Sequence, residues 1–226
     1  MSLKERYERV LADTARAHSA FGPAKLIVVT KNHPAELVAE LIDFGHRDFG
    51  ENRDQEASAK AARVLELRPE VESSWHFIGQ LQTNKVKSVL GYAESIHSID
   101  RESLAKELAK QLEKLDCKVD GFIELNLTED PSRGGVMPDQ LELLTEQVLQ
   151  IGRLNLLGVM AVAGLDKDPR SEFERVLGLS ERLRKLAPQA KGLSIGMSED
   201  YQIALEMGAT HIRVGSKITG PRDYSA

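Results

Sequence analysis

The stretch Lys25-Leu26-Ile27-Val28-Val29-Thr30-Lys31 decides the fold prediction, because it is a short apolar run that ends in a lysine. The run is too short for a buried helix and is rich in β-branched residues, which is typical of a strand covered on both faces in a parallel sheet. Ligands of α/β proteins bind outside the carboxyl ends of such strands. Lys31 is therefore the first candidate for a reactive amine, although most lysines simply point into water.

Outward from this strand, short apolar runs alternate with segments of helical periodicity. A helix is expected at 2–20, and strands at 25–31, 47–50, 73–78, 95–99, 118–127, 156–162, 192–196 and 210–214. Further helices are expected at 34–44, 52–67, from 83, and at 101–115, 138–151, 169–186 and 198–207. This alternation predicts a single (β/α)8 TIM barrel with an extra N-terminal helix, spanning residues 1–226 as one domain.

The composition argues against several classes of function. A net charge of −5, without any block of lysines and arginines, argues against a nucleic-acid partner. Cys117 is the only cysteine, and the six histidines show no ligand spacing, so neither a disulfide nor a metal site is expected. The N-terminus lacks the apolar core of a signal peptide, and no run of about 18 apolar residues occurs. Together with the single cysteine, this fits a protein of the reducing cytoplasm. The polar helices leave no large apolar stripe for a dimer, so we expect a monomer.

Polar residues at the predicted strand ends should meet at one mouth of the barrel. Asn52 follows the second strand, His76 lies in the third, and Arg213 lies in the eighth. The turn Gly196-Met197-Ser198 and the pair Gly215-Ser216 follow the last two strands, where this fold usually binds phosphate. Ser198 is expected to cap the helix after it. The alternatives are that this serine is only a cap and that His76 is an ordinary buried histidine.

A lysine amine that faces a phosphate-binding site suggests a Schiff base with a phosphorylated aldehyde. Pyridoxal 5′-phosphate is the commonest cofactor of this kind. Lys85 and Lys217 are competing amines, but Lys31 alone has the strand-end placement. Burial near Arg213 would lower the pKa of the Lys31 amine. A guanidinium against the pyridine nitrogen would keep that nitrogen unprotonated and make the ring a poor electron sink. The alternative for Arg213 is a salt bridge at the barrel rim.

Five segments together resemble the pyridoxal phosphate homeostasis protein family in order and spacing. They are Val29-Thr30-Lys31, Phe49-Gly50-Glu51-Asn52, Trp75-His76-Phe77-Ile78-Gly79, Gly196-Met197-Ser198-Glu199-Asp200 and Ile212-Arg213-Val214-Gly215-Ser216. The resemblance implies a barrel similar to the N-terminal domain of bacterial alanine racemases, with the cofactor held as an aldimine on Lys31. The cofactor-binding residues that it implies are Lys31, Asn52, His76, Met197, Ser198, Arg213, Gly215 and Ser216.

Within that resemblance, Arg213 would face the pyridine nitrogen, and Ser198, Gly215 and Ser216 would hold the phosphate. Asn52 and His76 would lie near the ring. One departure is Thr219, which stands where the family usually has phenylalanine and puts the shape of the mouth in question.

The resemblance implies a protein of intracellular cofactor homeostasis that holds pyridoxal 5′-phosphate without turnover and delivers it to pyridoxal-dependent apo-enzymes. One alternative is a racemase-like enzyme with Lys31 as one base. Its second base would come from a separate β-domain, which is not expected because the sequence ends at Ala226. Another alternative is a Schiff-base aldolase acting on a sugar phosphate. A G-x-S-x-G match at 192–196 is interpreted as chance, because Ser194 falls inside the predicted strand.

Overall fold

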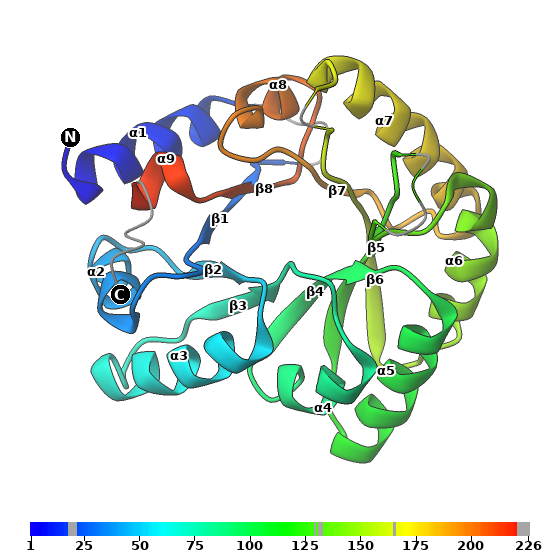
Figure 1. The fold of residues 1–226 in the computed structure, drawn as a ribbon, viewed down its shortest axis with the longest axis horizontal. Helices are drawn as coiled ribbons and strands as arrows, with labels where there is room; N and C mark the ends of the chain where they lie inside the picture. The colour runs from blue at the N-terminus through cyan, green and yellow to red at the C-terminus, as the bar shows by residue number, and fades with distance from the viewer. Residues whose placement is uncertain (18–21, 129, 131–132, 165, 221–226) are drawn as a thin grey trace.

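The computed structural model describes residues 1–17, 22–128, 130, 133–164 and 166–220. In this part of the chain, parallel strands pair in sequence order and close into a barrel, with the helices arranged around it (Figure 1). The strands are β1 (Lys25–Val29), β2 (Asp48–Glu51), β3 (Ser74–Phe77), β4 (Ala93–Ile99), β5 (Val119–Glu124), β6 (Leu154–Met160), β7 (Gly192–Ser194) and β8 (His211–Val214). The predicted (β/α)8 barrel is confirmed.

The helices follow the predicted periodicity closely. They are α1 (Leu3–Arg16), α2 (Ala35–Asp43), α3 (Asp54–Leu67), α4 (Val86–Val89), α5 (Glu102–Leu115), α6 (Leu141–Leu149), α7 (Pro169–Leu186), α8 (Tyr201–Glu206) and α9 (Ser216–Thr219), with 3₁₀ turns at Thr83–Lys85 and Pro138–Gln140. The extra N-terminal helix α1 begins with a capping box, in which Ser2 and Glu5 each accept a hydrogen bond from the other's backbone N–H. The single turn of α9 is too short to produce a periodic pattern and was not predicted.

Strand β5 ends three residues earlier than the predicted end at Leu127, because the following loop folds back on it. The N–H of Val136 donates to the carbonyl of Glu124 at 2.7 Å, and the N–H of Asn126 donates to the carbonyl of Val136 at 2.9 Å. An isolated bridge joins Leu125 to Val136. The apolar residues past Glu124 therefore belong to the barrel mouth.

The pairing of β1 with β8 closes the barrel and sets the level of the residues at its mouth. Lys25 lies opposite His211, and Ile27 lies opposite Arg213. Because both strands run in the same direction, the segments that follow them leave the barrel at the same end. This register brings Lys31 and the turn Gly215-Ser216 to one mouth.

Helix α1 lies beside α9 and near α8 on the outside of the barrel (Figure 1). The Arg6 side chain donates from Nε to the carbonyl of Ile218 in α9 at 2.7 Å. Asp13 accepts hydrogen bonds from the Tyr201 hydroxyl at 2.7 Å and from the Gln202 amide at 3.0 Å, both in α8. The N-terminal helix thus braces the two short helices that follow β7 and β8.

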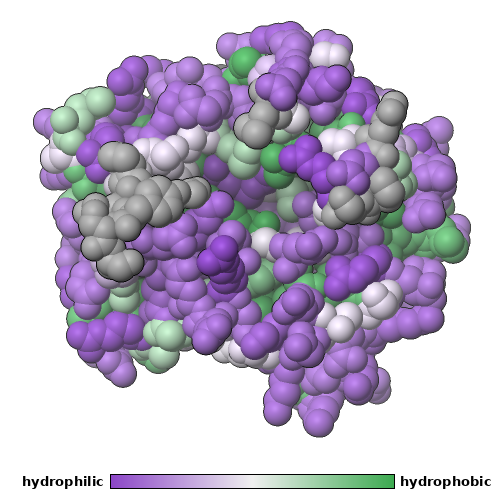
Figure 2. Space-filling model, viewed as in Figure 1, coloured by the Kyte–Doolittle hydropathy of each residue, from purple (hydrophilic) through white to green (hydrophobic). Residues whose placement is uncertain are grey.

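The face seen in Figure 2 is mostly hydrophilic, with apolar residues visible in a hollow near its centre. Among the helices of the described chain, none is long and apolar enough to cross a membrane.

We expect Gly158→Ala to destabilise the barrel. A Cβ at Gly158 in β6 would lie 2.0 Å from the carbonyl oxygen of Gly192 in β7, so the two backbones would have to separate. Overpacking of this kind costs about 1–3 kcal/mol or more, which urea unfolding would measure. The matched control is Gly178→Ala in the exposed part of α7, where nothing lies within 4 Å of the new Cβ. That change should stabilise the protein by about 0.5–1 kcal/mol; equal effects of the two substitutions would contradict the close approach at Gly158.

Candidate functional site

A cavity of about 480 Å³ opens at the carboxyl ends of the strands. Apolar side chains, among them Val29, Ile78 and Ala163, form part of its wall. The wall also includes six of the residues singled out in the sequence, namely Lys31, Met197, Ser198, Arg213, Gly215 and Ser216. The volume and the mixture of apolar wall with few polar groups are typical of a small-molecule site.

The loops after β7 and β8 are joined at the cavity. The Ser198 hydroxyl accepts a hydrogen bond from the N–H of Gly215 at 3.2 Å. Asp200, and not Ser198, stands at the N-cap position of α8, and its carboxylate accepts from the N–H of Met197 at 2.6 Å. The expectation that Ser198 caps a helix starting at 198 is therefore wrong. Its hydroxyl instead links the two loops, with the Ser216 hydroxyl group in the same wall.

Thr219 of α9 also lines the cavity. Its hydroxyl donates to the carbonyl of Gly215 at 3.3 Å and so bonds across the single turn of α9.

Arg213 is a buried guanidinium, 3% exposed, in the inner wall of β8. Its Nη1 donates to the carbonyl and the hydroxyl of Ser194 at 2.6 and 2.7 Å, and its Nη2 donates to the carbonyl of Ala161 at 2.9 Å. Within the described chain no carboxylate lies within 4 Å of it, so the predicted alternative of a rim salt bridge is not what is seen. Burial lowers the pKa of Arg213 to about 10. A cation without a direct counter-ion in a cavity wall suits a ligand that offers an acceptor.

The turn that carries Lys31 rests on a buried ion cluster. Lys60 Nζ, in α3, lies 2.6 Å from the Glu51 carboxylate and donates to the carbonyl of Thr30 at 2.8 Å. The Thr30 hydroxyl donates to the same Glu51 oxygen at 2.7 Å. On the other side of Lys31, the N–H of Asn32 donates to Glu56, which also pairs with Lys60 at 2.8 Å. Both neighbours of Lys31 are thus tied to one cluster.

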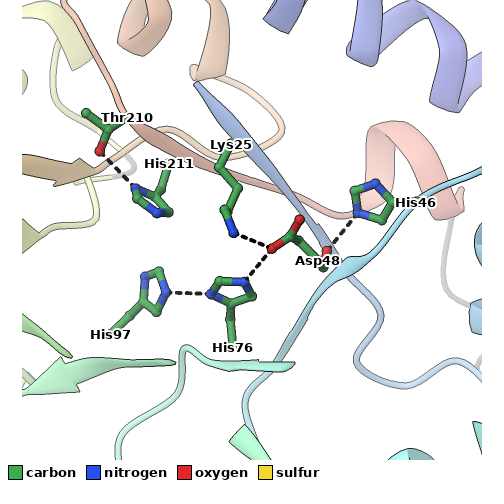
Figure 3. A network of polar contacts seen from close by, with 7 residues as sticks. All are labelled: Lys25, His46, Asp48, His76, His97, Thr210 and His211. Carbon is green, nitrogen blue, oxygen red and sulfur yellow. Dashed lines mark hydrogen bonds and ion pairs between the residues drawn. The ribbon is translucent and has the colours of Figure 1, made fainter. Parts of the chain in front are cut away.

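Two predicted site residues lie away from the described cavity wall. Asn52 lines a neighbouring cavity together with Lys85 and Gln82. His76 faces the barrel interior on the amino-terminal side, where its ring nitrogens lie 3.0 Å from Asp48 Oδ1 and 3.0 Å from His97 Nε2 (Figure 3). We therefore leave His76 out of the proposed site, whereas a contact of Asn52 with the cofactor stays a prediction. The alternative of a buried, hydrogen-bonded histidine describes His76 correctly.

Two further polar residues act on Arg213 but were not among the predicted site residues. Ser194 was set aside as a chance motif, yet its hydroxyl binds the Arg213 guanidinium. Glu124 lies at the carboxyl end of β5, and burial, reinforced by the charge of Asp100, raises its pKa to about 7. The sequence signal that could have found them is a polar residue at a position of the strand that faces the barrel interior, since inward and outward residues alternate along a strand.

Comparison with known proteins gives consistent matches along the chain. The family model described as "Alanine racemase, N-terminal domain" matches residues 7–223. The pyridoxal phosphate homeostasis protein of Aquifex aeolicus is 36% identical, with 99% of this chain and 100% of that protein covered. Its namesake in Vibrio cholerae is 34% identical, with 99% and 98% covered. The structure of PipY from Synechococcus elongatus PCC7942 with PLP bound has a TM-score of 0.85 at 32% identity, covering 96% of this chain and 99% of that one.

Removal of the Lys60 amine should destabilise the protein strongly. Lys60→Met leaves Glu51, 1% exposed, without its cation, and breaking a buried pair in this way costs about 3–5 kcal/mol. Denaturant unfolding would measure the loss. The control is Lys106→Met, whose partner Glu102 is exposed on α5, and whose effect should stay below about 1 kcal/mol. Similar small losses in both variants would show that the cluster does not hold the turn.

Glu124 should make stability fall as pH rises. Its folded pKa is about 7, above its ordinary value of 4.5, so the folded state keeps a proton that the unfolded chain releases between these pH values. The stabilisation is complete below pH 4.5 and is lost as pH rises through 7. Glu124→Gln removes this pH-dependent stabilisation. The free energy of unfolding of the variant, relative to that of the natural protein, should therefore increase steadily from pH 4.5 to about 7. A difference that is constant with pH would contradict the raised pKa.

Proposed function

The chain belongs to the pyridoxal phosphate homeostasis protein family, built on the alanine racemase N-terminal domain, and we propose that it holds pyridoxal 5′-phosphate covalently on Lys31 without catalytic turnover. The observation that carries the proposal is that the Lys31 amine, the buried Arg213 guanidinium and the hydroxyls of Ser198, Ser216 and Thr219 line one cavity. The relatives bear the name of a homeostasis protein, and PipY is a solved family structure with PLP bound.

The residues at the cavity fit each part of this cofactor. Lys31 supplies the amine for the aldehyde carbon, which is the chemistry lysines provide in pyridoxal proteins. The hydroxyls of Ser198 and Ser216 supply donors for the phosphate, and the N–H of Gly215 holds the Ser198 oxygen in place. The apolar residues Val29 and Ile78 supply a wall suited to an aromatic ring.

Arg213 supports a role without turnover. A guanidinium carries only N–H donors and stays charged, so in the proposed orientation it keeps the pyridine nitrogen unprotonated. Most amino-acid chemistry on this cofactor depends on an acidic partner that holds the nitrogen protonated. With Arg213 there instead, the ring would withdraw electrons poorly from a bound amino acid. The protein would then store the cofactor more readily than it would use it.

We propose that residues 1–226 act as one cofactor-binding domain, monomeric in solution, that exchanges pyridoxal 5′-phosphate with pyridoxal-dependent apo-enzymes. A carrier has to release its cargo, and an imine bond to a lysine is reversible in water. The proposed role therefore requires a cofactor that is bound covalently but not permanently.

The proposal predicts that Lys31→Ala abolishes the covalent cofactor. The natural protein, mixed with pyridoxal 5′-phosphate, should develop a visible absorption band that borohydride bleaches, and peptide mass spectrometry should then place the reduced adduct on Lys31. Lys85→Ala, which removes the competing amine at the neighbouring cavity, should leave band and adduct unchanged. A colourless natural protein, or an adduct that persists in Lys31→Ala, would overturn the proposal.

Loaded protein should also fail to racemise amino acids. Incubation with L-alanine in deuterium oxide, followed by chiral chromatography and proton NMR, should show neither D-alanine nor exchange at Cα above the rate given by free cofactor. Sustained exchange that depends on Lys31 would favour the racemase-like alternative.

A further inference from the structure

A line of polar side chains crosses the barrel interior from the cavity wall to the amino-terminal side, and the proposed function does not use it. Its members come from five different strands or strand ends and are Arg213, Ser194, His97, His76 and Asp48, which we call the polar chain. Consecutive contacts measure 2.7 Å from Arg213 Nη1 to Ser194 Oγ, 2.8 Å from Ser194 Oγ to His97 Nδ1, 3.0 Å from His97 Nε2 to His76 Nδ1 and 3.0 Å from His76 Nε2 to Asp48 Oδ1. Figure 3 shows the part of the polar chain from His97 to Asp48.

The two ends and the buried hydroxyl of Ser194 together set the direction of the hydrogen bonds in the polar chain. A guanidinium can only donate, and an ionised carboxylate can only accept. Arg213 therefore donates to the Ser194 oxygen, and the Ser194 hydroxyl donates a hydrogen bond to His97 Nδ1. His97 then donates from Nε2 to His76 Nδ1, and His76 donates from Nε2 to Asp48. Both histidines are neutral in this arrangement, and each carries its proton on Nε2.

The opposite arrangement leaves a buried group without a partner. If His76 carried two protons, His97 would donate from Nδ1 to the Ser194 hydroxyl, which also accepts from Arg213. The hydroxyl proton of Ser194, a fully buried residue, would then have no acceptor among the described contacts. An unmet buried donor costs about 1–3 kcal/mol.

The surroundings of His97 favour its neutral form as well. Lys25 lies 2.7 Å from Asp48, and hydrogen bonds from His76 and Lys25 outweigh the effect of burial and lower the pKa of Asp48 to about 2. Burial and the nearby cations, with Arg213 and Lys25 among them, hold the pKa of His97 well below its usual value. A proton added inside the barrel would therefore meet desolvation and like charge together.

We propose that Ser194, His97, His76 and Asp48 are positioning residues for Arg213, and that their one-directional hydrogen bonds hold its guanidinium in the cavity wall. Hydrogen bonds in such a series strengthen one another, so the Ser194 oxygen becomes a better acceptor for Nη1 than an isolated hydroxyl would be. The observed bonds occupy Nη1 and one N–H of Nη2, which leaves two of the five guanidinium donors to meet a ligand.

The first test needs no cofactor. At pH 8, two-bond proton–nitrogen NMR of the histidine-labelled protein should show His76 and His97 as neutral Nε2–H tautomers. Assignment by His76→Gln and His97→Gln is compared with His46→Phe, which removes a buried histidine outside the polar chain. An Nδ1–H tautomer at either residue would overturn the proposed direction.

The second test rests on the proposed function and asks whether the polar chain acts on the ligand. Ser194→Ala cuts the link to Arg213 and should weaken binding of pyridoxal 5′-phosphate by about three- to tenfold, with a shift of its bound absorption maximum. Asp48→Asn keeps the shape at the far end but removes the charge, and should shift the maximum in the same direction by less. His46→Phe is the control, because His46 meets the polar chain only at the backbone carbonyl of Asp48 and its loss should leave both readouts unchanged.

The two tests separate the failures. If the natural protein binds no cofactor, the proposed function fails, and the tautomers alone decide whether the polar chain runs as inferred. If the natural protein binds cofactor while Ser194→Ala and Asp48→Asn match it in affinity and absorption maximum, the positioning role is overturned. Loss of binding together with loss of the folded state in Ser194→Ala, seen by circular dichroism, would show a structural role only and would also overturn it.

Discussion

The parallel pairing of β8 with β1 is the contact on which the rest of the structure depends. It closes the sheet, and its register sets Ile27 opposite Arg213. Everything at the mouth follows from that register, because Lys31 and the turn at Gly215 leave the barrel at the same end. The Lys31 turn then has two fixed sides, with the buried Lys60–Glu51 pair beneath it and the β8 turn across the cavity. The backbone on both sides of Lys31 is therefore fixed at the edge of the cavity.

The second constraint is the buried charge of Arg213. A guanidinium removed from water needs acceptors, and the barrel supplies Ser194, Ala161 and the polar chain behind them. The interior of a (β/α)8 barrel is usually filled by branched apolar side chains. Here the layer on the amino-terminal side is polar and rich in histidine (Figure 3). Packing and the site are therefore coupled, since the groups that fill the barrel also orient the cation in its wall.

Much of this could be predicted from the sequence, and the misses have physical causes. Strand ends and loop glycines are local signals, so Lys31 and Gly215 fall where they were expected. His76 was placed near the mouth, but strand alternation alone does not say at which level of the barrel an inward residue lies; that level depends on the register between strands. Ser194 and His97 lie 97 positions apart, and their other partners, Arg213 and His76, are 19 and 21 positions away, so no local pattern encodes these contacts.

The most direct test of this account is a crystal structure of the protein with pyridoxal 5′-phosphate. The account predicts continuous density from the Lys31 amine to the cofactor, with the phosphate beside Ser198 and Ser216 and the pyridine nitrogen facing Arg213, whose contact with Ser194 is kept. Cofactor bound at Lys85 or Lys217, or lying in the cavity with a carboxylate at its ring nitrogen in place of Arg213, would contradict it.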